Sequence, residues 1–419
     1  MSGYAVVVGG GIGGLATAIG LRRIGWEVTV LERAAVLDDM GAGISLHANG
    51  MRALDALGVG EGVRRAARPQ YTGGTRTPGG GRLARMDGAA LERALGTPIV
   101  GIPRAALHRA LREALPAGCV VTGAEVTAVD LSDPRRARVS TATGNGSGSA
   151  READLVVAAD GVRSRLRALV APGHPGPAYS GSTVLRAITD RPVTLASDFE
   201  LTWGRGAEFG HIAFADGRAE WHAVLNSPPG VRFPDPLAET RRRFGGWHAP
   251  IPALLDATRP GAVLHHDIHE LVTPLPSFVA GRLALLGDAA HAMTPNLGQG
   301  ACQALEDAVT LAAALAAESG PGRRRTASQP GAAPGVDAAL VRYDAERRPR
   351  SQAVARAARQ AGRMGQRLSH PLAVALRDTA LRVAPSGATV RAILRHADWT
   401  APRLTPPAAT RQAESHGIE

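Results

Sequence analysis

Hydrophobic residues at the start of the chain follow a pattern typical of alternating strands and helices. Residues 4–8 form a short apolar run that indicates a buried strand, and the glycine-rich segment 9–14 follows directly. An apolar stretch of helical length covers 15–24, and a second strand pattern covers 27–31. Strand, glycine turn, helix and strand in this order predict a βαβ unit with a parallel sheet.

The glycines of this first turn have the spacing G-x-G-x-x-G, at Gly9, Gly11 and Gly14. Glycine there permits a tight turn, a close approach of a pyrophosphate to the backbone, and close packing of the helix. The second strand ends in Glu32, where an acid can accept hydrogen bonds from an adenosine ribose, and Arg33 beside it can reach phosphate or adenine. The pattern predicts a dinucleotide site and leaves NAD and FAD both open.

A second glycine-rich loop, with Gly41 and Gly43, leads into a helical pattern that ends near residue 57. Two glycines would let the backbone approach a flat ring system, which a simple NAD domain does not need at this point and which favours FAD. Residues 73–81 are predicted to form a turn between short strands or a surface loop. A further helix is predicted over 104–115, and Arg104 at its start is either a solvated charge or a cofactor contact.

Two later strand patterns end in an aspartate. The run 154–159 is followed by Asp160 and Gly161, and the run 282–286 leads to Asp288. Ligands of α/β sheets bind at the carboxyl ends of parallel strands, so both aspartates are candidate ligand-binding residues. For Asp160 and Gly161, an ordinary turn is the alternative interpretation.

The stretch 287–300 joins the last of these strands to an apolar helix. It contains Pro295, Leu297, Gly298 and Gly300 in a glycine-rich helix start. Exposed backbone N–H groups at the positive end of a helix can meet an electron-rich part of a ligand. The alternative is a helix start that needs small residues and a proline whatever its function.

Residues 171–265 alternate short strand patterns with Gly and Pro turns, which predicts a β-sheet. Most of the scarce Phe and Trp residues lie here, and core packing accounts for most of them. Arg186, His211 and His222 are polar residues on strands that otherwise face a core or a pocket. They are candidate catalytic residues, with a structural role as the alternative for each.

The C-terminal part is expected to be helical over 336–400, with an interruption or kink at Pro349. A Tyr and Arg-Arg-Pro pattern within it is interpreted as structural. Residues 319–335 are predicted to be a disordered loop because they are rich in Gly, Pro, Ser and Arg, and 401–419 to be a tail.

Composition narrows the possible partners and surroundings. The net charge is +11, but every basic residue is Arg and these are mostly scattered, which argues against nucleic-acid binding. No apolar run is long enough for a membrane span, and two cysteines cannot form a disulfide framework, so a cytoplasmic protein is expected. We predict no metal site, and either a monomer or a homodimer.

The three motifs occur in one order: G-x-G-x-x-G with Glu32, Asp-Gly at 160–161, and the stretch 287–300. This set resembles the single-component, FAD-dependent aromatic hydroxylases, flavoprotein monooxygenases related to p-hydroxybenzoate and salicylate hydroxylases, over roughly residues 1–360. The resemblance implies an α/β fold with a Rossmann-type FAD domain, a smaller β-sheet substrate domain and C-terminal helices. The expected FAD domain combines 1–70, 98–170 and 266–318, and the expected substrate domain combines 71–97 and 171–265.

The resemblance also implies roles for the motif residues. The expected cofactor-binding residues are Gly9, Gly11, Gly14 and Glu32 for the ADP half of FAD, Arg33, Gly43 and Arg104 as further FAD contacts, Asp160 and Gly161 for FAD and NAD(P)H, Asp288 for the ribityl chain, and Pro295, Gly298 and Gly300 beside the isoalloxazine. The candidate catalytic residues are Pro295, Leu297 and Gly298 together with Arg186, His211 and His222.

The implied activity is a monooxygenation that consumes NAD(P)H and O2. FAD would be reduced by NAD(P)H, and a flavin C4a-hydroperoxide would hydroxylate an aromatic or heteroaromatic small molecule, in natural-product tailoring or aromatic catabolism. An epoxidising or Baeyer–Villiger monooxygenase of the same fold, or a non-oxygenating FAD-dependent reductase or cyclase, remains an alternative. The sequence does not identify the substrate or the choice between NADH and NADPH.

Overall fold

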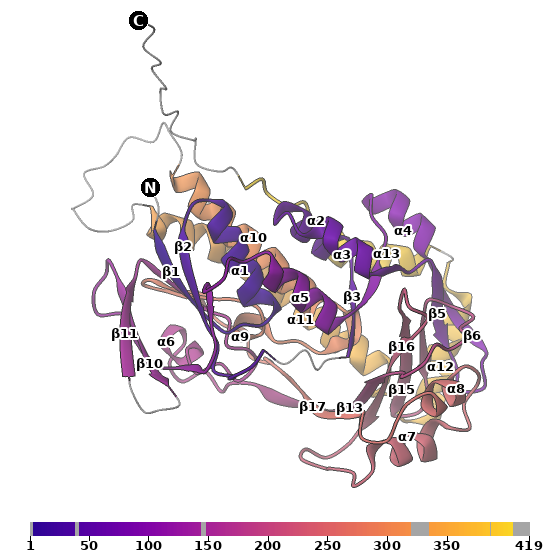
Figure 1. The fold of residues 1–419 in the computed structure, drawn as a ribbon. Helices are drawn as coiled ribbons and strands as arrows, with labels where there is room; N and C mark the ends of the chain where they lie inside the picture. The colour runs from indigo at the N-terminus through magenta and orange to yellow at the C-terminus, as the bar shows by residue number, and fades with distance from the viewer. Residues whose placement is uncertain (1–2, 38–41, 144–147, 320–334, 386, 405–419) are drawn as a thin grey trace, which may run out of the picture.

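The computed structural model describes residues 3–37, 42–143, 148–319, 335–385 and 387–404 (Figure 1). Two larger β-sheets organise the chain, with helices packed against both. In Figure 1 the parallel sheet lies on the left beneath helices α1 and α10, and the larger, mainly antiparallel sheet lies on the right above α7 and α8. The candidate site lies where these two parts of the fold meet.

The parallel sheet has the strand order β18-β19-β12-β1-β2-β8. Strand β1 pairs in parallel with β2 and β12, and β12 pairs in parallel with β19, so the carboxyl ends of these strands share one edge. The strands are β1 (Tyr4–Val8), β2 (Glu27–Leu31), β8 (Val120–Val121), β12 (Leu155–Ala158), β18 (Val279–Ala280) and β19 (Leu283–Leu285). This sheet carries the predicted βαβ unit and confirms the predicted α/β class.

Helices α1 and α10 pack closely against each other, and α1 also packs against β1 and β2. Their contact is tight because small side chains meet there: a Cβ on Gly20 would lie 3.1 Å from the Cβ of Ala312. The main core follows this contact into α11. The helices of this part are α1 (Ile12–Arg23), α2 (Ala48–Ala56), α3 (Gly60–Ala66), α5 (Arg104–Glu113), α6 (Arg167–Val170), α9 (Asp288–His291), α10 (Gly300–Ser319) and α11 (Val336–Met364).

A three-stranded antiparallel sheet with the order β11-β10-β9 lies between β8 and β12 in the chain. It contains β9 (Ala124–Asp130), β10 (Ala137–Thr143) and β11 (Gly148–Ala153). A second small sheet joins β3 (Gly43–Leu46), β7 (Val100–Pro103) and β4 (Arg68–Pro69), and β3 also contacts β15 and β16 of the larger sheet.

The larger sheet has the order β17-β13-β16-β15-β14-β5-β6. Its strands are β5 (Thr72–Arg76), β6 (Arg82–Asp87), β13 (Ala178–Ile188), β14 (Phe199–Trp203), β15 (Ala207–Ala213), β16 (Ala219–Asn226) and β17 (Leu264–Glu270). The prediction of a turn or loop at 73–81 was wrong for its first residues, which form β5. Gly73 and Gly74 fit there because a Cβ on either would lie 1.9 or 2.1 Å from a backbone oxygen of a neighbouring strand.

One face of this sheet packs on two helices, α7 (Pro236–Phe244) and α8 (Ile251–Asp256), which the sequence pattern did not predict. Phe209 and Trp221 stack with ring centroids 5.7 Å apart, and Phe244 joins them from α7. Strand residues alternate between faces, so the residues next to Trp221 point to the opposite face. That face is turned toward β3.

The C-terminal region is helical, as expected. Besides α11 it contains α12 (Pro371–Val383) and α13 (Ala388–Ala397), and α4 (Gly88–Leu95) packs on α13. Of the two expectations at Pro349, the interruption was wrong, because α11 continues through this residue, and the kink stays a prediction. Arg347 and Arg350 flank the proline and bind buried carboxylates on α10, which holds this part of α11 in place.

Several sequence predictions fall outside the described residues. These are residues 320–334 of the predicted disordered loop, residues 405–419 of the predicted tail, and Gly41. The boundaries of the two domains stay a prediction. Across the described ranges, no helix combines the length and apolar character that crossing a membrane requires.

Candidate active site

The first glycine turn follows β1 and has little space for side chains. A Cβ on Gly9, whose φ is +111°, would lie 2.3 Å from the backbone oxygen of Ala159, and a Cβ on Gly14 would lie 1.9 Å from the oxygen of Gly9. Gly11, at the N-cap of α1, differs, because a Cβ there would meet nothing within 4 Å. The turn therefore packs tightly on the protein side and is open on the side where a pyrophosphate would lie.

Glu32 fixes this turn from the end of β2. One carboxylate oxygen accepts a hydrogen bond from the backbone N–H of Gly10 at 2.7 Å, and the other accepts from Ala34 at 2.8 Å. A carboxylate has about four acceptor positions, so the group can still accept from a ribose hydroxyl. Arg33 lies beside it with an exposed side chain.

The sequence left a ligand-binding role and an ordinary turn as alternatives for the Asp-Gly pair after β12. The structure shows features of both. Asp160 closes a turn, because its Oδ2 accepts from the N–H of Arg165 at 2.9 Å. Its Oδ1 is buried and has no hydrogen-bond partner among the described residues. A Cβ on Gly161, whose φ is +82°, would meet nothing within 4 Å. A buried acceptor beside open space suits a bound polar ligand.

Arg167 joins the second motif to the third. Its guanidinium is buried and donates to the backbone oxygens of Ala289 at 2.8 Å, Val162 at 2.9 Å and Asp288 at 3.1 Å. The chain after Asp160 and the chain at Asp288 are thereby held together.

Asp288 is exposed to solvent although the residues on either side of it are buried. Desolvation by the surrounding protein raises the pKa of its carboxyl, while the positive charges of His291, Arg104 and Arg167 act in the opposite direction. Arg104 lies within electrostatic reach of both Asp288 and Arg186: desolvation and Arg186 lower its pKa, and Asp288 raises it. Arg104 therefore stands between the parallel sheet and the larger sheet.

The stretch 295–300 forms a 3-10 turn, η1 (Pro295–Leu297), followed by α10. Gly298 has a φ of +62°, and its N–H donates to the oxygen of Pro295 at 2.8 Å. That N–H is therefore already used inside the turn, unlike the first N–H groups of α10, which have no partner within the helix. A Cβ on Gly300 would meet nothing within 4 Å, so the helix start faces open space.

His47 lies against this turn and was missed by the sequence analysis. A Cβ on Gly298 would lie 3.2 Å from its Nε2. Burial, and to a smaller extent His396, lower the pKa of His47 to about 4, so its imidazole is neutral at pH 7. No spacing or strand pattern distinguished this residue.

Buried charged residues hold the start of the stretch 287–300 in place. Asp307 of α10 accepts from the backbone N–H of Gly287 at 2.9 Å, from His291 Nε2 at 2.6 Å and from Arg347 Nε at 2.7 Å. Burial alone would raise the pKa of Asp307, but His291 and Arg347 lower it to about 2. The carboxylate is therefore ionised and fully paired.

The same cluster extends to the other end of the stretch through Glu306. Arg347 binds Glu306, and Asn49 donates to Glu306 at 2.6 Å and to the side chain of Gln299 at 2.8 Å. Arg350 adds two bonds to Glu306 at 2.7 and 2.8 Å. We call Asn49, Gln299, Glu306, Asp307 and Arg347 the closed cluster, since each is at most 1% exposed.

A second polar group lies on the face of the larger sheet that points away from α7 and α8. Glu220, which is fully buried, accepts from Arg186 Nε at 3.1 Å and NH2 at 2.8 Å, and lies 3.2 Å from His222 Nδ1. Glu208 lies 3.8 Å from His222 Nε2 and accepts from Trp203 at 2.6 Å. We call Arg186, Glu208, Glu220 and His222 the open cluster, because Arg186 and His222 are partly exposed.

Charges within the open cluster shift its pKa values. Burial lowers the pKa of His222, but Glu220 and Glu208 outweigh burial and raise it overall. Burial lowers the pKa of His211, which lies on the other face of the sheet with its Nε2 3.2 Å from the oxygen of Ser197. The structure therefore brings Arg186 and His222 together and does not place His211 with them.

Gly43 connects the open cluster to β3. Its backbone oxygen accepts from Arg186 at 2.8 Å, and a Cβ on it would lie 2.6 Å from the Cβ of Glu220. Glycine is therefore required here because the backbone of β3 lies close to the larger sheet. Gly210 has a similar effect, because a Cβ there would lie 2.3 Å from His222 Nε2. The Glu-x-His spacing in one strand was the signal that could have located Glu220.

These observations fit a dinucleotide cofactor. A Cβ would meet open space at three positions, Gly11, Gly161 and Gly300. These positions come after the carboxyl ends of β1, β12 and β19, which share one sheet edge. The unpartnered Oδ1 of Asp160 and the exposed carboxyl of Asp288 are on this edge as well. Parallel sheets bind cofactors at this edge. No group of three or more His, Cys, Asp or Glu suited to a metal occurs in the described part of the chain.

Comparison with known proteins identifies the family. The family model described as "FAD binding domain" matches residues 4–216 and 272–358. The chain belongs to this FAD-binding family. The flavoprotein is 37% identical to the aurachin C monooxygenase/isomerase of Stigmatella aurantiaca, over 86% of this chain and 89% of that protein.

One further relative is a monooxygenase by name, and one solved structure of similar fold contains FAD. The flavoprotein is 36% identical to 3-amino-4-hydroxybenzoate 2-monooxygenase PtnB3 of Streptomyces platensis, over 85% of this chain and 87% of that protein. The crystal structure of Klebsiella pneumoniae HpxO complexed with FAD and uric acid matches with a TM-score of 0.82 and 26% identity, over 94% of this chain and 96% of that chain. The flavoprotein is an FAD-dependent monooxygenase that uses NAD(P)H and O2, and this confirms the class inferred from its sequence.

Proposed function

We propose that the enzyme hydroxylates an electron-rich aromatic or N-heteroaromatic ring that carries an acidic hydroxyl or lactam group. The observation that carries this proposal is the open cluster, which places a histidine between two glutamates, with Arg186 beside them, on the sheet face opposite α7 and α8. The names of the relatives support the substrate class, since they include an aminohydroxybenzoate monooxygenase, a hydroxynicotinate monooxygenase and a urate hydroxylase.

Bound FAD supplies electron transfer from NAD(P)H and activation of O2. We assign the ADP half of FAD to the first glycine turn and Glu32, and its ribityl chain to Asp288. Arg104 lies near both Asp288 and Arg186, so it can add positive charge where cofactor and substrate meet. The N-terminus of α10 adds a partial positive charge beside it.

His222 is the proposed proton acceptor for the substrate. Its Nδ1 is within hydrogen-bond distance of Glu220, whereas its Nε2 is 3.8 Å from Glu208, too far for a normal hydrogen bond. Nε2 can therefore exchange a proton with a ring hydroxyl, while Glu220 stabilises the imidazolium that results. Arg186 would attract the deprotonated ring, which is more electron-rich and easier to hydroxylate.

Oxygen addition followed by rearrangement is the second candidate. It is favoured by the relative named aurachin C monooxygenase/isomerase, which shares 37% identity over most of both chains. The same cluster would hold the substrate in either reaction, so the products rather than the kinetics separate them.

The test uses purified, FAD-loaded enzyme with NADH or NADPH and a panel of phenols, hydroxypyridines, quinolones and purines under ¹⁸O2. A product that gains one ¹⁸O atom at a ring carbon supports hydroxylation, and a rearranged carbon skeleton supports the second candidate. His222→Asn should bind the same ring but turn it over slowly. If every ring only speeds NAD(P)H oxidation and all the oxygen appears as peroxide, the proposal fails in favour of a reductase or cyclase.

We also propose that the enzyme acts in the cytoplasm as a monomer or homodimer, in natural-product tailoring or aromatic catabolism. Both cysteines, Cys119 and Cys302, are buried and free, which is compatible with a reducing compartment. Sedimentation of the holoenzyme at several concentrations tests the oligomeric state, and a species larger than a dimer would contradict it.

A further inference from the structure

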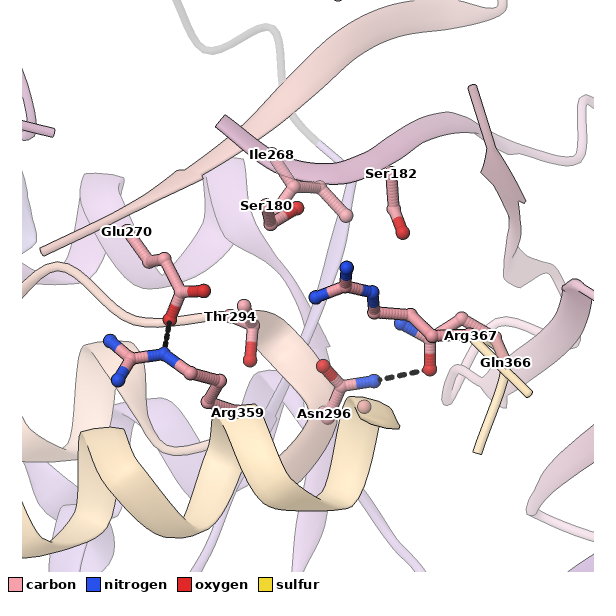
Figure 2. Close-up of a pocket in the computed structure, with 10 residues that line it drawn as sticks. Ser180, Ser182, Ile268, Glu270, Thr294, Asn296, Arg359, Gln366 and Arg367 are labelled. Atoms are coloured by element: carbon pink, nitrogen blue, oxygen red, sulfur yellow. Dashed lines mark hydrogen bonds and ion pairs between the residues drawn. The ribbon is translucent and has the colours of Figure 1, made fainter. Parts of the chain in front are cut away.

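A small polar cavity lies beside the turn that contains Pro295 and outside both clusters (Figure 2). Its volume is about 10 Å³, which is close to the minimum that admits one water-sized particle. Strands β13 and β17 form one wall, η1 forms a second, and the end of α11 forms a third. The cavity therefore touches four elements from different parts of the sequence.

Two of the three hydroxyls that line this cavity lack partners. Ser180 is 6% exposed and Thr294 is 7% exposed, and neither hydroxyl has a hydrogen-bond partner in the part of the chain that the structure describes. Leaving a buried hydroxyl unpaired costs about 1 to 3 kcal/mol. Two such groups in one cavity indicate that it accommodates a ligand able to accept hydrogen bonds.

Arg367 supplies an unpaired positive charge. Its backbone is held by bonds to the oxygen of Gly362 at 3.1 Å and from the side chain of Asn226 at 3.2 Å, but its guanidinium contacts no acceptor in the described ranges. Figure 2 shows this guanidinium in the middle of the cavity, with Ser180 on one side and Thr294 on the other. Arg367 is exposed at the surface, so an ion can reach the group from solvent.

The other charges of the cavity cancel each other. Glu270 is 2% exposed and is paired with Arg359, whose Nε lies 2.8 Å from its Oε2. Arg359 also donates to the oxygen of Leu271 at 3.0 Å. The net charge of the lining is therefore that of Arg367 alone, which favours an anion over a cation.

The remaining amide can adapt to either kind of ligand. Asn296 and Gln366 form a side-chain hydrogen bond of 2.8 Å, and the Oδ1 of Asn296 has no partner in the described chain. Two amides can form this bond in either orientation, so Asn296 can turn an N–H group toward the cavity instead. The amide then adds one more donor to those of Arg367, Ser180 and Thr294.

We propose that this cavity binds one small monovalent anion of halide size, held by Arg367 and the hydroxyls of Ser180 and Thr294. A bound anion links η1, β13 and the end of α11. Thr294 and Asn296 flank Pro295, so occupancy restrains the turn at which the isoalloxazine is proposed to lie. Halide binding therefore changes the environment of the cofactor without entering the substrate site.

The test titrates the oxidised holoenzyme with sodium bromide against sodium gluconate at constant ionic strength and follows the flavin absorbance. Wild type should show a saturable change. Arg367→Gln should weaken bromide binding at least about tenfold, and Thr294→Val about fivefold, because Arg367 contributes a full positive charge and Thr294 contributes a single hydrogen bond. Arg363→Gln removes the same charge from an exposed position on α11 and should behave as wild type.

Crystals of the holoenzyme grown with bromide provide the second readout. An anomalous peak between Arg367 and Thr294 in wild type, absent in Arg367→Gln, supports the site. A cavity that holds only water at saturating bromide overturns it. A peak in crystals without a saturable response in solution indicates an adventitious ion only and also overturns it, as does equal affinity in Arg367→Gln and Arg363→Gln.

Discussion

The closed and open clusters both bury glutamate beside arginine, yet they differ in what surrounds the pairs. In the closed cluster, Arg347 and Asp307 are at most 1% exposed, and the carboxylates of Asp307 and Glu306 accept bonds from several protein donors. In the open cluster, Arg186 is 32% and His222 is 18% exposed at the side chain. Buried carboxylates that are paired with several donors hold their partners rigidly, whereas a network with accessible donors can bind.

The two clusters show where this enzyme needs rigidity. The closed cluster grips both ends of the stretch 287–300, at Gly287 and at Gln299, where the cofactor is proposed to lie. The open cluster faces the proposed substrate and keeps His222 Nε2 free of a close partner. Four predictions test this contrast, in order of decreasing expected effect.

Breaking the closed cluster should have the largest effect. Arg347→Met leaves two buried carboxylates without their main partner and should lower the free energy of unfolding by about 3 to 5 kcal/mol. Urea unfolding of the apoprotein measures this loss. Arg342→Met, which removes an exposed ion pair on the same helix, should cost about 0 to 1 kcal/mol. Equal losses in the two variants would show that the cluster does not stabilise the fold.

Breaking the open cluster should change activity and spare stability. His222→Asn should lower kcat about 100-fold through loss of the proton acceptor, with little change in unfolding free energy because the residue is partly exposed. Steady-state kinetics on a substrate found in the panel measure this. His370→Asn, at an exposed helix end, is the control. A kcat within a factor of three of wild type would remove His222 from the mechanism.

Removing a partner at the edge of the closed cluster should lower stability less than removing Arg347 from its centre. Arg350 binds Glu306 but is 24% exposed, so Arg350→Gln should lower the unfolding free energy by about 1.5 kcal/mol, the contribution of a charged hydrogen bond. A loss as large as that of Arg347→Met would mean that exposure does not set the order within the cluster.

The smallest expected change is a shift in pH dependence. Glu220 raises the pKa of His222, so Glu220→Gln should lower that pKa and move the limb of the kcat/KM profile that His222 controls toward lower pH. Profiles of wild type and variant are measured from about pH 5 to about pH 9, a range that spans an ordinary histidine pKa of about 6.5. A limb that stays in place, or moves to higher pH, would contradict the assignment.

Local patterns located the parts of the site that depend on backbone geometry. Gly9, Gly14 and Gly298 were recognisable because glycine is required where a side chain would collide or φ is positive. Strand patterns ending in Asp160 and Asp288 placed both on one sheet edge, since parallel strands end on the same side. For His211 and His222 the pattern could not choose, because it did not show which face of the sheet the two missed helices cover.

The sequence by itself therefore determined the family, the cofactor and the segments that form the strands beside it, because these depend on short motifs in which neighbours along the chain are also neighbours in space. Only the tertiary structure decided the partners of the buried charges. Asn49 meets Glu306 across more than 250 positions, and Arg186 meets the oxygen of Gly43 across more than 140. Such pairings follow from how the sheets and helices pack, and no local pattern encodes that packing.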